Sequence, residues 1–317
     1  LRNYLDVMLA AARYGFDDEA AALGDIAESL MAAARHLVLP GGLPLIGDIS
    51  PDCPPAFLTG IDVGKGDWAA LRDEEDRDRL TRFAETAGAV SSDAIQADGW
   101  LSADFGRWSA LAHVPPEGWP FMPGHAHQDM GSAEIHVDDA PLFVDPGRGR
   151  YGEEGDAAFY RSSAAHGTLR IDRANPYPAN KPYYDDAFRA RHAGPAAAMR
   201  HADGFTIAHG GYKRLGADDV RRRWHFSEDQ FRIEDGISGH GHHRIERALV
   251  TPLAVHIDDG AAIVDGRFTV TCPDARLRLE DVTVWHAYNS GMPGTRIVFE
   301  TEADLPWSGT LTVGEIT

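Results

Sequence analysis

The feature that most constrains the fold of this chain is a long succession of short, alternating apolar and polar segments between residue 96 and the C-terminus. Glycine, proline and aspartate separate these segments, as is typical of turns between strands. Residues 108–114, 220–226 and 295–300 are examples. Strands of this kind bury their apolar faces by packing sheet on sheet, so the pattern predicts a large antiparallel β-sandwich over residues 96–317.

The first 95 residues show a helical periodicity instead. Apolar residues recur at spacings of three and four in residues 1–15 and again in 17–39, where Asp17 is a candidate N-terminal cap. A third, charge-rich helix is predicted over 68–89. The sequence therefore predicts an α+β protein of two domains, a helical one over 1–95 and the β-sandwich after it.

The composition of the chain argues against two classes of partner, nucleic acids and membranes. Its net charge of −19 argues against nucleic acid, which needs a basic protein surface. No apolar run approaches the roughly 20 residues of a membrane span, so we expect no membrane partner. The given sequence begins at Leu1 without a charged and apolar leader, so we expect no signal peptide within it. Cys53 and Cys272 lie in unlike contexts and do not indicate a disulfide framework.

Residues 121–175 hold the densest set of metal-binding and proton-transfer groups in the sequence. Within them, His125, His127 and Asp129 follow one another at a spacing of two. In an extended strand this spacing places all three side chains on one face. A His-x-His pair alone is also typical of a solvated or hydrogen-bonded face, so the metal prediction depends on its neighbours.

Two further segments supply such neighbours. The apolar residues 141–144 predict a strand that ends at Asp145, where a Pro-Gly turn follows. Another strand is predicted over 168–171, just after His166. Two imidazoles and one carboxylate suit Zn²⁺, which takes nitrogen and oxygen ligands in a tetrahedral shell. We therefore predict a zinc site formed by His127, Asp145 and His166.

The same stretch contains three longer motifs: Gly-His-Ala-His-Gln-Asp at 124–129, Pro-Leu-Phe-Val-Asp-Pro-Gly at 141–147 and Tyr-Arg-Ser-Ser-Ala-Ala-His-Gly-Thr at 160–168. In order and rough spacing they resemble the heparinase II/III-like family of polysaccharide lyases. The resemblance implies an α/α toroid followed by a β-sandwich, a structural zinc, and β-elimination at uronic acid residues of an acidic polysaccharide. It also implies a periplasmic or secreted location, with a cytoplasmic one as the alternative.

Three residues are candidates for the chemistry. The resemblance implies that His125 is the site histidine beside the substrate. Its imidazole, with an ordinary pKa of about 6.5, could neutralise a uronate carboxylate or act as a base. Tyr151 and Tyr160 are candidate proton donors, although a tyrosine on a strand is also typical of a half-buried packing residue.

Other residues are candidates for binding the substrate. Arg148 and Arg161 belong to a local group of arginines that could attract a polyanion despite the acidic net charge, or could simply be solvated. Loops similar to residues 43–55 line the cleft in the family, which makes Asp48 a possible rim residue; the alternative is a turn residue.

Two other functional classes remain open at this point. A noncatalytic carbohydrate-binding β-sandwich would keep zinc only as a structural link. A cupin-like metal enzyme is suggested by His-x-His followed by Glu134 and Gly147, but six residues separate His127 from Glu134, where cupins have a shorter spacing.

The helical part sets a limit on the lyase interpretation. In the family the principal tyrosine and an Asn-His pair come from the toroid, and residues 1–95 contain no matching Asn-His motif. About three helices do not close a toroid. We expect them to form a partial helical layer beside the sandwich, and the isolated chain to show little turnover or to form a homo-oligomer through exposed apolar surface.

Overall fold

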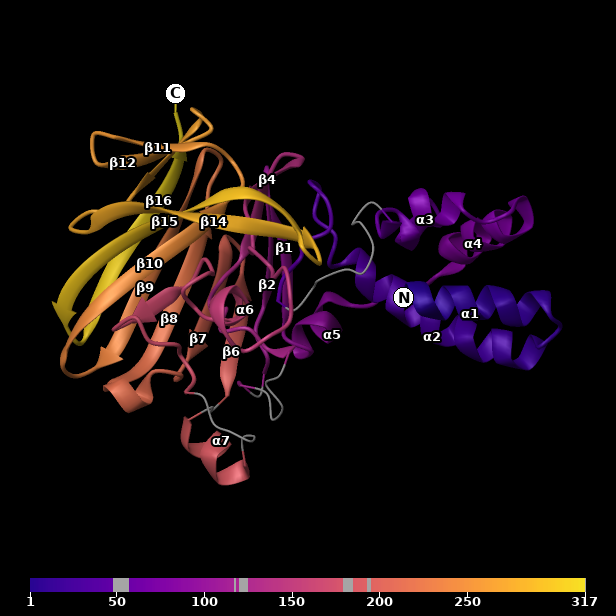
Figure 1. Ribbon diagram of the computed structural model, residues 1–317, viewed down its shortest axis with the longest axis horizontal. Coiled ribbons are helices and arrows are strands. Elements are labelled where there is room, and N and C mark those ends of the chain that lie inside the picture. The colour runs from indigo at the N-terminus through magenta and orange to yellow at the C-terminus, as the bar shows by residue number, and fades with distance from the viewer. Residues whose placement is uncertain (48–56, 117, 120–124, 179–184, 193–194, 317) are drawn as a thin grey trace.

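A helical layer at the N-terminus lies beside a larger β-sandwich (Figure 1). This computed structural model describes residues 1–47, 57–116, 118–119, 125–178, 185–192 and 195–316. Within them the helices are α1 (Arg2–Arg13), α2 (Asp17–Arg35), the 3-10 helix η2 (Ile61–Val63), α3 (Asp67–Ala70), α4 (Glu74–Thr86), α5 (Ser92–Ala97), α6 (Gly155–Arg161), α7 (Asp186–His192) and the 3-10 helix η4 (Lys213–Leu215).

Three antiparallel sheets make up the sandwich. The strands are β1 (Trp100–Phe105), β2 (Trp108–His113), β3 (Glu134–Val137), β4 (Ala140–Phe143), β5 (Leu169–Ile171), β6 (Ala196–His201), β7 (Gly204–His209), β8 (Ala217–Phe226), β9 (Gln230–Gly239), β10 (His242–Thr251), β11 (Val255–Asp258), β12 (Ala261–Val264), β13 (Phe268–Thr271), β14 (Arg276–Ala287), β15 (Ser290–Asp304) and β16 (Trp307–Glu315). One eight-stranded sheet has the order β11-β12-β13-β16-β9-β8-β7-β6, and two four-stranded sheets have the orders β1-β2-β3-β4 and β14-β15-β10-β5.

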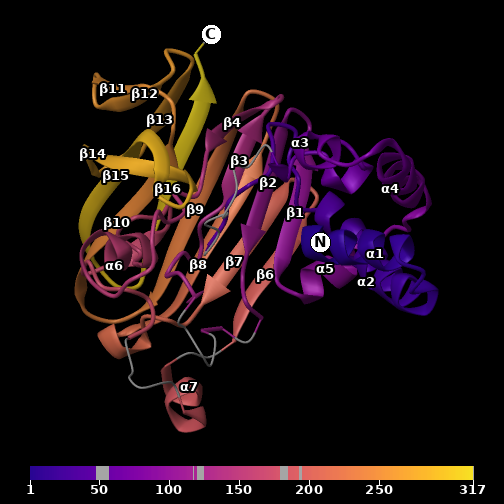
Figure 2. The ribbon, with the colours of Figure 1, turned by 45° about the vertical axis from the view of Figure 1, so that its right-hand side comes forward.

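A single apolar core joins the three sheets. It includes Trp108 of β2, Phe231 of β9 and Ile297 of β15, one from each sheet. Figure 2 shows β1 to β4 lying across β7 to β9, with the helical layer beyond β1. The two small sheets therefore face the large one. The predicted class, a short helical part followed by a large antiparallel β-sandwich, is confirmed.

The helical layer has its own core and differs from the prediction in two ways. The helix expected over 68–89 is divided, because the side chain of Asp73 accepts the N–H of Asp76 and starts α4 as a new helix. Asp17 is the first residue of α2 and makes no capping hydrogen bond. Within the described residues, no helix is both long and apolar enough to span a membrane.

A buried ion pair lies in the core between the sheets. Phe231, Ile233 and Ile237 alternate along the buried face of β9, and Asp235 shares that face. Arg222 of β8 compensates its charge, with Nε 2.7 Å from Oδ1 of Asp235, and both side chains are almost completely buried. Such a pair is costly to desolvate and strongly destabilising to break.

Arg222 also fixes two loops outside the large sheet. Its terminal nitrogen donates hydrogen bonds to the carbonyl oxygens of Gly131 at 3.0 Å and Gly167 at 3.1 Å. Gly131 has φ +83°, which favours glycine, and a Cβ there would lie only 3.1 Å from Cδ of Arg222. The loops before β3 and before β5 are therefore held at one point.

We expect Arg222→Met to lower the free energy of unfolding by about 3–5 kcal/mol, because it leaves Asp235 as an uncompensated buried charge. The double variant Arg222→Met with Asp235→Leu should recover part of this loss, since both charges are then absent. Urea denaturation of the three proteins gives the comparison. A double variant no more stable than Arg222→Met would contradict the assigned role of the ion pair.

Candidate functional site

His127, Asp145 and His166 come together in the folded chain. One possible ligand atom from each lies within 4.8 Å of the other two, and all three side chains are buried. Asp145 follows β4, His166 precedes β5, and His127 lies in the segment before β3. The structure thus brings the three residues of the predicted metal site into one buried cluster.

The cluster lies at the seam between the two four-stranded sheets. Beyond the end of β4, the N–H of Val144 donates to the carbonyl of Val250 in β10 at 2.9 Å. On the same edge of β10, two residues earlier, the N–H of Ala248 donates to the carbonyl of Thr168 at 3.1 Å, while the opposite edge of β10 pairs with β15. A carbonyl of β10 thus accepts a hydrogen bond from the chain after β4, and an N–H of β10 donates one to the chain before β5. These two bonds set the separation of Asp145 and His166.

The expected strand over 125–129 is wrong. Residues 125–133 form turns and irregular chain, and β3 begins only at Glu134. The backbone N–H of Gln128 donates to the carbonyl of Arg161 at 2.9 Å, and its side chain makes hydrogen bonds with the backbone of Tyr177 in both directions. These bonds to α6 and to a distant loop replace the pairing that a strand would need.

Electrostatics prepare the cluster for a cation. Nδ1 of His166 lies 2.9 Å from Oδ2 of Asp145, whose other oxygen accepts the N–H of Gly147 at 2.8 Å. Burial alone would raise the pKa of Asp145 and lower that of His166, but their mutual attraction outweighs it and shifts each pKa toward the charged form. Burial, followed by the charge of His166, lowers the pKa of His127 to about 3.

The donor set fits a divalent metal ion. His127 is a neutral imidazole at working pH, as a metal ligand must be. Nε2 of His166 is buried and has no hydrogen-bond partner among the described residues. Two imidazoles and a carboxylate leave one position of a tetrahedral shell for a further ligand. Binding an ion here must displace the proton of His166, so ion and proton compete.

Two carboxyl groups beside the cluster, those of the buried Glu134 and the half-buried Asp129, have no part in the predicted zinc site. These carboxyl groups lie with His113 and Asp145 around a gap too small to hold a water molecule. Burial raises the pKa of Asp129 to about 7 and also raises that of Glu134. Glu134 accepts the N–H of Asp145 at 3.4 Å and pairs with His136 at 3.2 Å. The fold places both acids beside Asp145 of the candidate metal cluster.

His125 lies on the surface next to Tyr151. The two rings meet edge to face with centroids 5.6 Å apart. The guanidinium of Arg148 covers the Tyr151 ring at 4.4 Å, and its side chain is only 1% exposed. Arg148 therefore supports Tyr151 from inside the protein, whereas His125 and Tyr151 are open to solvent.

The other predicted site residues have different surroundings. Tyr160 of α6 is 7% exposed, and its hydroxyl accepts the backbone N–H of Thr283 at 2.7 Å, which leaves its own proton to donate. Arg161 is half-buried at the end of α6. Asp48 lies outside the described residues.

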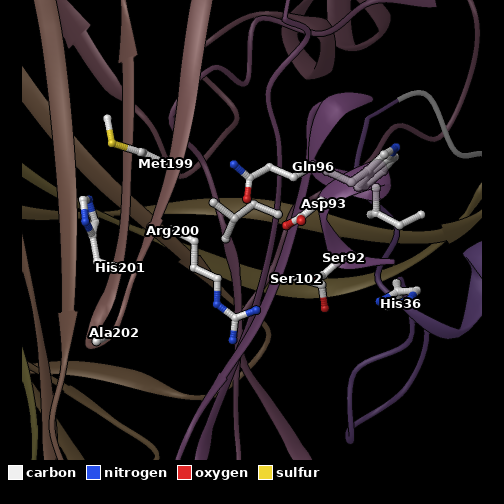
Figure 3. A pocket seen from close by; sticks show the side chains of 12 residues that line it. His36, Ser92, Asp93, Gln96, Ser102, Met199, Arg200, His201 and Ala202 are labelled. Carbon is white, nitrogen blue, oxygen red and sulfur yellow. The ribbon is translucent and has the colours of Figure 1, made fainter. Parts of the chain in front are cut away.

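A separate pocket of about 490 Å³ lies between α5, β1 and the turn that joins β6 to β7. Figure 3 shows Arg200 and His201 on one side of the pocket and Asp93 and Ser102 on the other. Among the described residues, none of the site residues predicted from the sequence lines this pocket.

Comparison with known proteins identifies the family to which this chain is related. A family model described as heparinase II/III-like, C-terminal, matches residues 87–314. The structure is similar to heparan sulfate lyase HepC from Pedobacter heparinus, with a TM-score of 0.68 and 16% identity, over 98% of this chain and 50% of that one. It is also similar to the heparinase III-BT4657 gene product, with a TM-score of 0.65 and 15% identity, over 98% and 50%. No curated protein matched the chain. The chain spans about half the length of these structures.

We expect one metal ion per chain and its loss in His127→Ala, because that substitution removes a buried ligand. The melting temperature should fall by about 5 °C or more, since a domain of this size loses roughly 2–4 °C per kcal/mol. Elemental analysis of protein purified without a His-tag measures the metal, and calorimetry the melting temperature. The control is His242→Ala, which removes an exposed histidine paired only with Asp304. Metal-free wild-type protein with a full native fold would refute the site.

Proposed function

Because this chain belongs to the heparinase II/III-like family, we propose that it acts on a uronic-acid-containing polysaccharide by β-elimination. The observation that supports this most directly is the exposed His125 against the exposed Tyr151, two residues from the buried cluster that contains His127. Two groups that can exchange protons thus lie side by side at the surface, next to a rigid buried anchor.

The reaction needs three groups. The uronate carboxylate must be neutralised so that the proton on C5 becomes acidic, a base must remove that proton, and an acid must protonate the oxygen that leaves C4. As the C–H electrons form the C4–C5 double bond, the C4–O bond breaks. In this proposal His125 neutralises the carboxylate or removes the proton, and Tyr151 or Tyr160 supplies the proton for the leaving oxygen.

The cluster of His127, Asp145 and His166 would hold a structural Zn²⁺. The bound ion would supply a cross-link between the chain before β3, the end of β4 and the start of β5. Burial of all three ligands separates that position from the surface on which His125 lies. The protein's own part is to keep His125 in a fixed position through the short connection to His127.

The local charge and the similar structures support an anionic polysaccharide as the substrate class. Arg148, Arg150 and Arg161 lie in or beside the segments that carry Tyr151 and Tyr160. Arg150 is exposed and favours an anionic sugar despite the overall charge of −19, whereas Arg161 is half-buried and Arg148 is almost completely buried. The similar structures include a heparan sulfate lyase, so we propose a glycosaminoglycan as the polymer class.

A second candidate function is carbohydrate binding without cleavage. It is favoured by the burial of Tyr160 and Arg148, which are 7% and 1% exposed and so offer little surface to a reacting sugar. A binding protein would be retarded on a column of immobilised uronate polysaccharide without producing the ultraviolet absorbance of an unsaturated sugar. A lyase must produce that absorbance.

We expect His125→Ala to retain its metal and its melting temperature but to lose elimination by about 10²–10⁴-fold, as is typical when a general acid or base is removed. The assay follows the absorbance of the unsaturated product from heparan sulfate. His242→Ala again serves as the control and should match the wild type. Loss of metal in His125→Ala would reassign that residue as a ligand, and undiminished elimination would remove it from the reaction.

A further inference from the structure

The turn of the β14–β15 hairpin is attached to the segment that follows Asp145. The N–H of Trp285 donates to the carbonyl of Pro146 at 2.9 Å, and the N–H of Asn289 donates to the carbonyl of Gly149 at 2.8 Å. A Cβ on Gly149 would lie 2.6 Å from carbons of the Trp285 ring, so only glycine allows this contact. Although about 140 residues separate them in sequence, the hairpin and the segment form one unit.

Two exposed tyrosines lie side by side on this unit. Tyr288 of the hairpin turn is 46% exposed and Tyr151 is 51% exposed. Their ring centroids are 6.1 Å apart and their planes are inclined by 32°. The ring of His125 also contacts Tyr151, edge to face. Neighbouring, partly exposed aromatic rings with polar ends are typical of binding surfaces, because one face accepts an apolar group while the hydroxyl stays in water.

A pocket of about 120 Å³ opens beside these rings. It is lined by Gly149, Arg150, Asp156, Tyr160, Trp285 and Asn289, and by Ala157. The pocket combines aromatic walls with a guanidinium, a carboxylate and an amide, which is the mixture of groups that recognises a sugar ring and its substituents.

The charge in the pocket is available to a ligand. The guanidinium of Arg150 lies 3.5 Å from a carboxylate oxygen of Asp156, and both side chains are more than half exposed. Such an exposed pair contributes little to stability and can be exchanged for another anion. An arginine offers paired donors that suit a carboxylate or a sulfate.

We propose that Tyr288, Tyr151 and the pocket with Arg150 form a subsite for a neighbouring sugar unit that has an anionic substituent. The inference rests on the proposed function, because the same polymer would pass from this subsite to His125. A pyranose ring would stack on the Tyr288 and Tyr151 rings, and Arg150 would bind its carboxylate or sulfate. Tyr288 and Arg150 are then specificity residues that hold the chain, without a part in bond cleavage.

The test measures affinity in a background that cannot cleave. All proteins carry His125→Ala, and calorimetric titrations use heparan sulfate oligosaccharides, which have sulfate and carboxylate groups, and hyaluronan oligosaccharides, which have carboxylates only. Tyr288→Ala should weaken binding about threefold to tenfold, the range for loss of one aromatic contact. Tyr288→Phe should bind like its parent, because the ring remains.

Two further variants separate charge from stacking. Arg150→Gln should weaken binding of the anionic oligosaccharides and reduce its salt dependence, because one cationic contact is lost. If only heparan sulfate binding falls, the group held by Arg150 is a sulfate; if both fall, it is a carboxylate. Tyr14→Ala removes an exposed tyrosine of the helical layer and should leave the affinity unchanged.

The outcomes distinguish a failure of the proposed subsite from a failure of the proposed function. Unchanged affinity in Tyr288→Ala and in Arg150→Gln, with binding by the parent and an unchanged melting temperature, overturns the subsite and leaves the proposed function intact. If Tyr288→Ala lowers the melting temperature, the affinity of Arg150→Gln alone decides whether the subsite exists. Failure of the wild-type protein to bind either polymer overturns the proposed function, and the subsite with it.

Discussion

The contact on which the site most depends is made by Arg222, a residue of the large sheet with no expected part in the chemistry. Its charge is neutralised by Asp235 inside the sandwich, and its remaining donors bind the carbonyls of Gly131 and Gly167. The loop with His127 and the loop with His166 therefore share one rigid support. A buried cation with fixed acceptors has few alternative arrangements, since each lost bond would leave a desolvated polar group.

The buried cluster continues this arrangement outward. The attraction between Asp145 and His166 overcomes the effect of burial on both pKa values and shifts each pKa toward the charged form. Asp145 follows β4 of one four-stranded sheet and His166 precedes β5 of the other, so the pair links the two sheets beyond the ends of these strands. A metal ion between Asp145, His166 and His127 would replace one proton with a stronger link at the same place.

The surface above the cluster depends on these buried contacts. Tyr151 is held by Arg148 from below, and the β14–β15 hairpin is held against Gly149. Both connections belong to the short segment that begins at Asp145. A change in the geometry of that residue would reach Tyr151 and Tyr288 through the backbone, which couples the structural cluster to the groups that would contact a polysaccharide.

The sequence alone determined the class of the fold, because a two-residue period in the strands and a period of 3.6 in the helices are local properties. It also determined the set of His127, Asp145 and His166, since their residue types and their places near strand ends can be read from motifs. It could not determine the division of the helix over 68–89, which depends on the side-chain bond from Asp73 to the backbone of Asp76.

Only the tertiary structure decided what lies around these residues. The expected strand over 125–129 does not form, because Gln128 finds hydrogen-bond partners near Arg161 and Tyr177, which are distant in sequence. The position of Trp285 and Tyr288 beside the site likewise follows from long-range pairing of the hairpin with residues 146–149. Local patterns record which residues can bind metal or transfer protons, but the neighbours that orient them come from chain segments that meet only when the sheets pack.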